Sequence, residues 1–261
     1  MHQLLAYLKF RLRAGTAHGL HSPFVYGLYT TVVCHDGEFG AYRRVEARRQ
    51  ALLASEQTLT VRDFGAGSQV AGAGGSRRAV RAIARHAAKP PRLAQLLFRL
   101  VNHFRPATTL ELGTSLGLTT AYLALADSRQ RVLSFEGCPA TAAVARETFA
   151  ELGLANVKLV EGNLDETLPA TLAGLSAPLD FVFFDGNHRY EPTLRYFELC
   201  LAKAHAESVF VVDDIHWSAE MERAWTAIQA HPAVVVTVDL FHVGLVFFRP
   251  QQPRQHFQLR Y

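Results

Sequence analysis

Acidic side chains follow two apolar runs in the second half of the chain. Asp185 comes directly after one run, and the pair Asp213–Asp214 comes directly after the next. If the two runs are parallel strands, their carboxyl ends meet at the edge where open α/β sheets bind ligands. Three hard oxygen ligands at that edge would suit Mg²⁺ or Ca²⁺. In the alternative, Asp185 shapes a substrate cleft and one of the pair caps a helix expected over 217–230.

One histidine lies close to these carboxylates in the sequence, because His188 follows Asp185 by three residues. An imidazole can take a proton from a hydroxyl at neutral pH, so His188 is the candidate general base, with Asp185 beside it in the catalytic group. The alternative is a loop histidine that bonds to the backbone or supports a metal ligand through a hydrogen bond. His216 is the reserve candidate for the base.

A glycine-containing turn indicates a second kind of chemistry, the binding of a nucleotide-like cofactor. The stretch TTLELGTSLG, residues 108–117, runs from a strand-like segment through Gly113, Ser115 and Gly117 into a helical pattern. Glycines at such a turn let the backbone approach a ligand, and the start of the helix presents free N–H groups. Glu136 ends the next apolar run, where doubly wound folds place a carboxylate that accepts hydrogen bonds from ribose hydroxyls.

A second acidic and glycine-rich loop, DFGAGS at 63–68, competes for this role. About 20 residues further on, a ribose-binding acid should end a strand. The sequence instead has the basic stretch 81–89 there. The loop 111–117 passes the same test through Glu136. We therefore expect the loop 63–68 to be a lid bordering the site or a structural turn, within a glycine-rich stretch, 65–75, that looks like a mobile loop.

These residues need a scaffold that brings strand ends together, and the spacing of apolar runs predicts one. The runs lie at 108–112, 131–135, 157–160, 180–184, 208–212, 233–238 and 243–248. Helix-length segments, such as 117–126, 139–152 and 190–204, separate the first five. This alternation predicts an α/β fold with a doubly wound, mostly parallel sheet and helices on both faces. Only a few residues join the last two runs, so these must pair antiparallel as a C-terminal hairpin.

Residues 1–90 have a different pattern, and we expect them to form a mainly helical cap or extension before a domain that covers 91–261. A short amphipathic helix is indicated by four leucines at helical spacing, Leu4, Leu5, Leu8 and Leu12. Further helices are expected near 41–55 and over the basic stretch 77–89.

Charge is distributed unevenly along the chain. Residues 1–100 contain 15 Lys/Arg and 5 Asp/Glu, whereas residues 101–261 contain 12 and 18. A basic leading segment can contact an anionic substrate, nucleic acid or a membrane surface, or it is simply a solvated face. Nucleic acid is not expected, because the stretch 77–89 lacks the aromatic residues on which bases stack. A membrane-surface contact through the basic segment is kept as a hypothesis.

Cysteine usage points away from a disulfide framework and from a zinc site. The three cysteines, Cys34, Cys138 and Cys200, are widely spaced and form no CxxC motif. The basic residues of the N-terminus follow its apolar run, which is the wrong order for a secretory signal. No apolar run approaches the roughly 18 to 20 residues of a membrane span. We therefore expect reduced thiols in a cytoplasmic protein.

Six motifs in order resemble the class I S-adenosylmethionine-dependent methyltransferases over about residues 92–250. They are LELGTSLG, FEG, EGNLDETLP, FVFFDGNHRY, VVDDIHW and VDLFHVGLVFF. Within that class the chain is most similar to the O-methyltransferases of the catechol, caffeoyl-CoA and macrocin types. Such enzymes have a Rossmann-like, seven-stranded sheet with an antiparallel last strand, in agreement with the hairpin. The resemblance implies S-adenosylmethionine as cofactor and an oxygen of a small-molecule acceptor as the methylated atom.

The resemblance also implies a role for each motif residue. The methionine part of the cofactor would be lined by Glu111, Gly113, Ser115 and Gly117, the ribose would be bound by Glu136, and the adenine would lie beside Gly162 and Asn163. Asp185 would lie near the transferred methyl group. With Asp213 and Asp214 it would also hold the Mg²⁺ or Ca²⁺ by which cation-dependent relatives activate the acceptor oxygen. Those relatives commonly have Asn where this chain has Asp214.

His188 stands where macrocin-type relatives have a histidine and catechol-type enzymes a lysine base. The first 90 residues match none of the family's common core, so the resemblance gives them no role.

Two other functions use parts of the same pattern. A nicotinamide-dependent oxidoreductase would share the parallel sheet, but ELGTSLG lacks the third glycine of GxGxxG and the sheet ends in a hairpin. A non-catalytic membrane- or RNA-associated module would keep the fold and bind through its basic N-terminal part. The order and spacing of the six motifs favour the methyltransferase.

Overall fold

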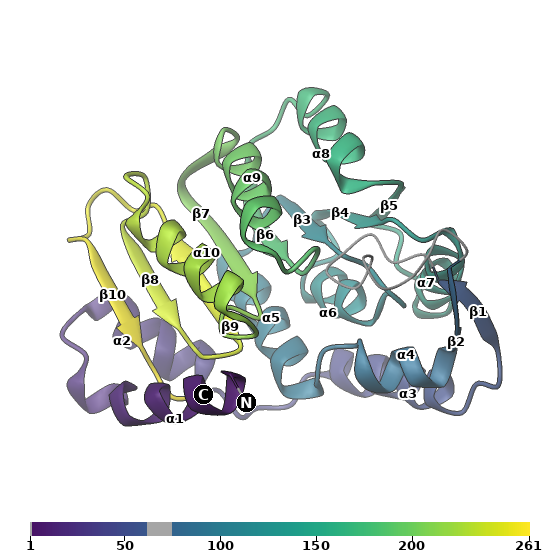
Figure 1. Cartoon of the computed structure of the whole chain (residues 1–261), viewed down its shortest axis with the longest axis horizontal. Helices are drawn as coiled ribbons and strands as arrows, with labels where there is room; N and C mark the ends of the chain where they lie inside the picture. Colours follow the sequence, from purple (N-terminus) through teal and green to yellow (C-terminus); the bar gives the residue numbers. More distant parts are fainter. Residues whose placement is uncertain (1, 62–74) are drawn as a thin grey trace. The chain divides into compact units, whose positions relative to one another are not determined.

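The computed structural model describes residues 2–61 and 75–261. The loop 63–68, expected to be a lid or a turn, lies outside the described residues. The chain forms two compact units (Figure 1). The middle unit is Asp36–Leu175, and the terminal unit combines Met1–His35 with Ser176–Tyr261. This division differs from the boundary expected at residues 90–91, which stays a prediction.

The middle unit contains a parallel three-stranded arrangement in the order β3-β4-β5, with helices between the strands. Its elements are α3 (Gly40–Leu53), β1 (Thr58–Val61), β2 (Ser76–Ala79), α4 (Val80–His86), α5 (Pro91–Phe104), β3 (Thr108–Leu112), α6 (Leu118–Ala126), β4 (Arg131–Glu136), α7 (Pro139–Leu152), β5 (Val157–Glu161) and α8 (Leu164–Ala173). Every residue of β3 is buried, as expected for a strand covered on both faces.

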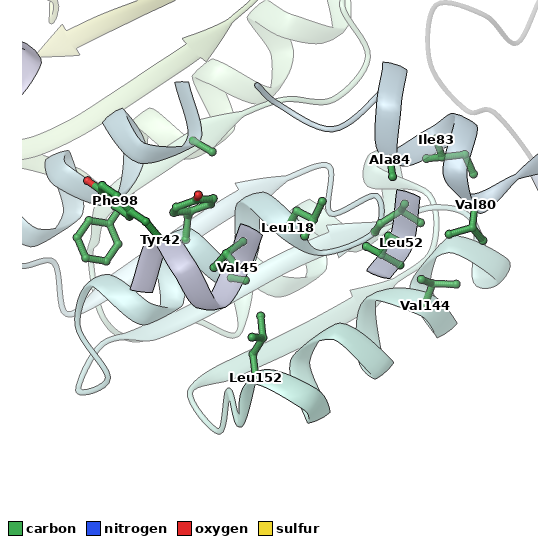
Figure 2. Packing of buried hydrophobic residues seen from close by; sticks show 14 of the residues in the cluster. Tyr42, Val45, Leu52, Val80, Ile83, Ala84, Phe98, Leu118, Val144 and Leu152 are labelled. Carbon is green, nitrogen blue, oxygen red and sulfur yellow. The ribbon is translucent and has the colours of Figure 1, made fainter. Parts of the chain in front are cut away.

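Helix α3 packs into the core of the middle unit. Figure 2 shows Tyr42, Val45 and Leu52 of α3 in one hydrophobic cluster with residues of α4, α5, α6 and α7. Polar contacts hold the same helix, because the Tyr122 hydroxyl donates to Glu46 at 2.9 Å. Arg44 also donates to the carbonyl of Leu152, at 2.6 Å. Part of the expected N-terminal extension is thus built into the core, where it packs against α6, the helix that follows the glycine turn.

The terminal unit contains five strands in the order β10-β8-β9-β7-β6. Its elements are α1 (His2–Arg13), η1 (Ala17–Gly19), α2 (Pro23–Leu28), η2 (Tyr29–Val33), β6 (Leu179–Phe184), α9 (Tyr190–Leu201), β7 (Ala204–Asp213), α10 (Ala219–Ala230), β8 (Val236–Asp239), β9 (Val243–Phe247) and β10 (Gln255–Gln258). Strands β6 and β7 are parallel, and β9 lies antiparallel between β7 and β8. The expected C-terminal hairpin is therefore present.

The fold class is confirmed: a mixed α/β chain with mostly parallel strands and flanking helices. The seven strands expected from the apolar runs are β3 to β9. An eighth, β10, pairs in parallel with β8. Within residues 2–61 and 75–261, no helix combines the length and the apolar character that a membrane span requires.

Two expected helices begin later than predicted. The basic helix expected over 77–89 starts only at Val80, because the preceding residues form β2, which pairs antiparallel with β1. The helix expected over 217–230 starts at Ala219. Its cap is Ser218, whose side chain accepts a hydrogen bond from the backbone N–H of Met221 at 3.2 Å. Neither Asp213 nor Asp214 caps this helix, so the predicted capping role is wrong, whereas the shaping of a substrate cleft by Asp185 stays a prediction.

Candidate active site

The carboxyl ends of β6 and β7 bring two of the predicted acids together. The parallel register pairs Phe184 with Val212, so the residues that follow, Asp185 and Asp213, lie at the same edge. Ligand atoms of Asp185, His188 and Asp213 lie within 4.8 Å of one another. His188 Nε2 is 3.6 Å from Asp185 Oδ1. Two carboxylates and an imidazole thus form a compact polar cluster at the edge where ligands bind in such sheets.

Asp214 is not a member of this cluster. Its backbone has a positive φ of 52°. The Asp214 N–H donates to the carbonyl of His242 at 2.7 Å, and its own carbonyl accepts from the N–H of Trp217 at 2.9 Å. Asp214 therefore forms a tight left-handed turn, a conformation that Asp and Asn tolerate better than most residues. The structure groups His188, in place of Asp214, with the two other predicted metal ligands.

The loop between Asp185 and His188 holds a further polar atom. Asn187 has a positive φ of 54°, and its Oδ1 is buried without a hydrogen-bond partner among the described residues. An amide carbonyl oxygen is a common ligand of hard cations. Asn187 carried no signal in the sequence analysis beyond its place in the motif FVFFDGNHRY.

His216, the reserve candidate for the base, is engaged on both ring nitrogens. Nδ1 lies 3.1 Å from Glu222 Oε1, and Nε2 lies 2.9 Å from Asp239 Oδ2. The ring also stacks on Phe241, with 5.1 Å between centroids. Burial lowers the pKa of His216, but the hydrogen bonds and charges of Asp239 and Glu222 outweigh it and raise the pKa above its ordinary value. An imidazolium held between two carboxylates has no lone pair for a substrate proton, so we assign His216 a structural role.

This arrangement predicts a pH-dependent contribution to stability. A histidine with a raised pKa in the folded state contributes fully below its unfolded pKa, and the contribution is lost as the pH rises through the folded pKa. Asp239 is only 1% exposed, so removing its partner in His216→Ala should cost on the order of 3 kcal/mol at mildly acidic pH. Urea unfolding of both proteins across neutral pH measures the difference, which should shrink toward alkaline pH. A difference that is constant with pH would contradict the charged pair.

The glycine turn after β3 has the geometry expected of a cofactor loop. Gly113, Ser115 and Gly117 all have positive φ, between 50° and 111°. The N–H groups of Gly113 and Thr114 donate to the carbonyl of Phe135, which ties the turn to β4. A Cβ at Gly117 would lie 2.7 Å from the ring of Phe149, so glycine is required there for packing against α7. Gly117 thus has a structural function whether or not a ligand touches it.

Glu111 lies beneath this turn in a buried hydrogen-bond network. Its side chain is fully buried, and Oε2 accepts from the hydroxyls of Thr120 and Ser134, both at 2.5 Å. Thr114 and Ser134 also share a hydrogen bond of 2.5 Å. The sequence analysis missed these hydroxyl residues. The network holds Glu111 under the loop, and its contact with the methionine part of a cofactor stays a prediction.

Glu136 at the end of β4 fixes the backbone of both neighbouring loops. Its carboxylate accepts from the N–H of Ser115 at 2.7 Å and from the N–H of Cys138 at 2.8 Å. Burial raises the pKa of Glu136 above its ordinary value, against the lowering effect of these backbone hydrogen bonds. Each carboxylate oxygen carries two lone pairs, so the group can accept further hydrogen bonds while holding the loop.

The turn after β5 contains the pair expected beside the adenine. Gly162 has a φ of 128°, and its N–H donates to the carbonyl of Glu136 at 3.0 Å. Asn163 caps α8 by accepting from the N–H of Asp165 at 3.1 Å. The backbone of Gly162 is thus joined to the end of β4. Contact of either residue with an adenine stays a prediction.

Comparisons with known proteins find a match over the region that carries these turns. Residues 110–215 match the family model of a methyltransferase domain. Among solved structures, the chain is similar to the O-methyltransferase TomG of Streptomyces achromogenes, in complex with S-adenosylmethionine. That alignment has 20% identity and a TM-score of 0.55, and covers 86% of this chain and 95% of that one.

Two further structures show the same likeness. An O-methyltransferase of Bacillus cereus in complex with S-adenosylhomocysteine has 17% identity and a TM-score of 0.56, over 84% of this chain and 94% of that one. A methyltransferase of Podospora anserina bound to S-adenosylhomocysteine has 13% identity and a TM-score of 0.59, over 90% of this chain and 99% of that one. At such identities these matches establish the fold.

Residues 110–215 thus match a methyltransferase domain, and the chain has a Rossmann-like fold, as the resemblance of its motifs predicted. Residues 91–261 are 171 of the 261 residues, so matches that span 84–90% of the chain extend into the first 90. Part of the N-terminal region, which the motifs left unassigned, thus belongs to the shared architecture.

Proposed function

We propose that the protein transfers a methyl group from S-adenosylmethionine to an oxygen of a small-molecule acceptor. The methyltransferase domain supports the reaction class. Two relatives of the same fold are O-methyltransferases in complex with S-adenosylmethionine or S-adenosylhomocysteine, which supports the cofactor and the oxygen acceptor. The observation that carries the assignment within this chain is the cluster of Asp185, His188 and Asp213 at one strand edge. A cytoplasmic location and the absence of a nucleic-acid partner remain predictions.

The cofactor would be held by the middle unit. Gly113 and Gly162, both with positive φ, lie in the turns at the ends of β3 and β5. Glu136 would accept hydrogen bonds from the two ribose hydroxyls in its charged form. S-adenosylmethionine, when bound, supplies a methyl group that is already activated for transfer. The middle unit therefore needs to bind and orient it, and it contributes no reacting group of its own.

The acceptor would be activated by the terminal unit. His188 would take the proton from the acceptor hydroxyl on a ring nitrogen, and the Asp185 carboxylate, 3.6 Å from His188 Nε2, would stabilise the imidazolium that forms. Asp185 and Asp213 would hold a divalent cation, and the carbonyl oxygen of Asn187 is available nearby in the chain. A bound cation would stabilise the negative charge that develops on the acceptor oxygen. Mg²⁺ fits the carboxylates, whereas inclusion of His188 among the ligands would favour a metal such as Mn²⁺.

A thermal-shift comparison of S-adenosylhomocysteine, NAD and a short RNA tests the class of function. A ligand that binds the folded state raises the melting temperature by mass action. We expect a rise with S-adenosylhomocysteine alone. A rise with NAD alone would favour the oxidoreductase, and a rise with RNA alone the non-catalytic module.

A substitution of Glu136 tests the cofactor site. Hydrogen bonds to a charged group contribute about 1.5 to 3 kcal/mol each, so Glu136→Ala should weaken S-adenosylhomocysteine binding at least about tenfold by calorimetry. Because the charged carboxylate accepts these bonds, affinity should also fall as the pH falls through the raised pKa of Glu136. Glu136→Gln should bind S-adenosylhomocysteine more weakly than the unmodified protein, and its affinity should depend less on pH.

Glu161 provides a matched control for this test. It ends β5 in register with Glu136 on β4, but its side chain is only partly buried and forms an ion pair with Arg146. Glu161→Ala should therefore bind S-adenosylhomocysteine like the unmodified protein. Equal affinity in Glu136→Ala and Glu161→Ala would remove Glu136 from the cofactor site.

A further inference from the structure

Exposed apolar side chains are concentrated on the first helix of the chain. Seven large apolar residues are exposed among the described residues, and five of them belong to α1: Leu4, Leu5, Tyr7, Leu8 and Leu12. Leu12 is 87% exposed and Leu4 64%. Contiguous exposed apolar side chains on a folded domain commonly mark an interaction surface.

The helix is held firmly by its opposite face. Ala6 and Phe10 are buried, and the Phe10 ring lies 5.4 Å from that of Phe241. The end of the helix is tied to the C-terminal segment, because Arg260 donates to the carbonyl of Ala14 at 3.1 Å. Gly15 also donates to the carbonyl of Gln258, at 2.9 Å. The terminal unit thus presents the leucines from a fixed helix, α1 in Figure 1.

Basic residues border the leucines along α1. At 100° per residue, Leu4, Leu8, Leu12 and Leu5 occupy a stripe about 100° wide. Arg11 lies at one side of this stripe, and Lys9 and Arg13 at the other. All three basic side chains are exposed, and none forms an ion pair with another described residue. The helix contains no Asp or Glu. A leucine stripe between cationic side chains is typical of helices that lie in the plane of a membrane surface.

We propose that α1 docks the protein on an anionic membrane surface, with the leucine stripe in the acyl boundary and its basic residues at the lipid phosphates. Charge complementarity favours this partner over a second copy of the chain. Two α1 helices packed through their stripes would bring Lys9, Arg11 and Arg13 of both copies together, with no acid on either helix to neutralise them. Anionic headgroups attract the same residues. This contact is additional to methyl transfer and does not depend on it.

Flotation of the full-length protein with lipid vesicles tests the proposal. We expect binding to vesicles of phosphatidylcholine with phosphatidylglycerol to exceed binding to phosphatidylcholine alone by about tenfold or more, and to weaken with added salt. Leu8→Gln with Leu12→Gln should lower binding about tenfold or more. Glutamine keeps good helix propensity, and both positions are exposed, so folding should be retained. Lys9→Glu with Arg11→Glu should abolish the preference for anionic lipid.

Matched controls lie elsewhere on the chain. Tyr26→Gln removes an exposed apolar side chain from α2, and Arg77→Glu with Arg78→Glu makes the same change in charge on β2. Each should bind vesicles like the unmodified protein. Unchanged melting temperatures would show that the α1 variants are folded. The proposal is overturned if the unmodified protein does not float with anionic vesicles, or if the leucine variant floats equally well. It is also overturned if light scattering shows a dimer that only the leucine variant dissociates, without vesicle binding.

Discussion

Replacement of His188 by alanine is expected to lower turnover by roughly 10²- to 10⁴-fold, the usual contribution of a general base. The imidazole lies beside Asp185, within the cluster at the carboxyl ends of β6 and β7. Without it, no neighbouring group of the cluster can take the acceptor proton equally well, since the carboxylates are weaker bases. Release of S-adenosylhomocysteine in the presence of an acceptor found by screening measures turnover. Affinity for the cofactor should be unchanged, because His188 is not among the residues expected to touch the adenosine.

The chain offers a close control for this substitution. His205 pairs with Asp180 at 3.0 Å, and these residues stand at the opposite ends of the same two strands. His205→Ala also removes a histidine that is paired with an aspartate. This pair lies at the start of the two strands, away from the cluster at their carboxyl ends. Its turnover should be nearly normal. Normal turnover in His188→Ala, or an equal loss in both variants, would contradict the assignment of His188 as base.

The same variant separates two roles that the geometry allows for His188. A histidine that only takes the proton leaves the cation site intact, so His188→Ala should retain any rise in melting temperature caused by Mg²⁺ or Mn²⁺. If His188 ligates the metal, His188→Ala should lose much of the rise in melting temperature that the cation causes. The ratio of the Mn²⁺ response to the Mg²⁺ response should fall in the second case, because the imidazole favours the softer ion.

The scaffold of the site was predictable because buried strands are continuous apolar runs. Such runs bounded by turns gave β3 to β9, and their alternation with helices predicted parallel pairing. Strand β10 is an edge strand that is only partly buried. Its sequence, QHFQ, is mostly polar and contains no apolar run from which a strand could be predicted. Strands β1 and β2 are likewise short, with four residues each, and only one of the eight is buried. Their pairing across a glycine-rich segment leaves little periodicity to detect.

The partition of the chain into units could not be predicted from local pattern. Gly15 forms a bridge with Leu259, and the hydroxyl of Tyr29 donates to the carbonyl of Arg260 at 2.7 Å. Contacts between residues so distant in sequence depend on tertiary packing. No change in composition marks residue 35, where the chain leaves the terminal unit and enters the middle unit. The predicted boundary near residue 90 followed a change of secondary structure, which is a different property.

The identity of the clustered acids was partly predictable. Successive side chains of a strand point to opposite faces of the sheet. If the strand continued through both residues, Asp213 and Asp214 could therefore not both point toward Asp185. This alternation alone does not predict which of the two acids joins the cluster. In the structure Asp213 joins the cluster, whereas Asp214 has a positive φ and lies in a turn whose N–H donates to the carbonyl of His242. Similarly, the sequence placed Glu136 at a strand end but could not show that backbone N–H groups already bind its carboxylate.

Replacement of Asp213 by asparagine should therefore abolish cation binding, whereas the same change at Asp214 should not. In the unmodified protein, a cation at 100 times its Kd should add about 2.7 kcal/mol of stability, which is several degrees in melting temperature. Asparagine keeps the shape of Asp213 but removes the charge that attracts the cation, so the rise should disappear. Loss of several kcal/mol of charge stabilisation should also reduce turnover by a hundredfold or more.

Asp214→Asn is the matched control, because it makes the same chemical change at the next residue. Its left-handed backbone tolerates asparagine, so folding should be normal. The cation-dependent rise should persist, since the Asp214 side chain lies outside the group formed by Asp185, His188 and Asp213. Loss of the rise in both variants would restore Asp214 to the ligand set. A melting temperature of the unmodified protein that responds neither to chelator nor to cation would leave Asp185 and Asp213 with the shaping of the acceptor site, and His188 as the sole activating group.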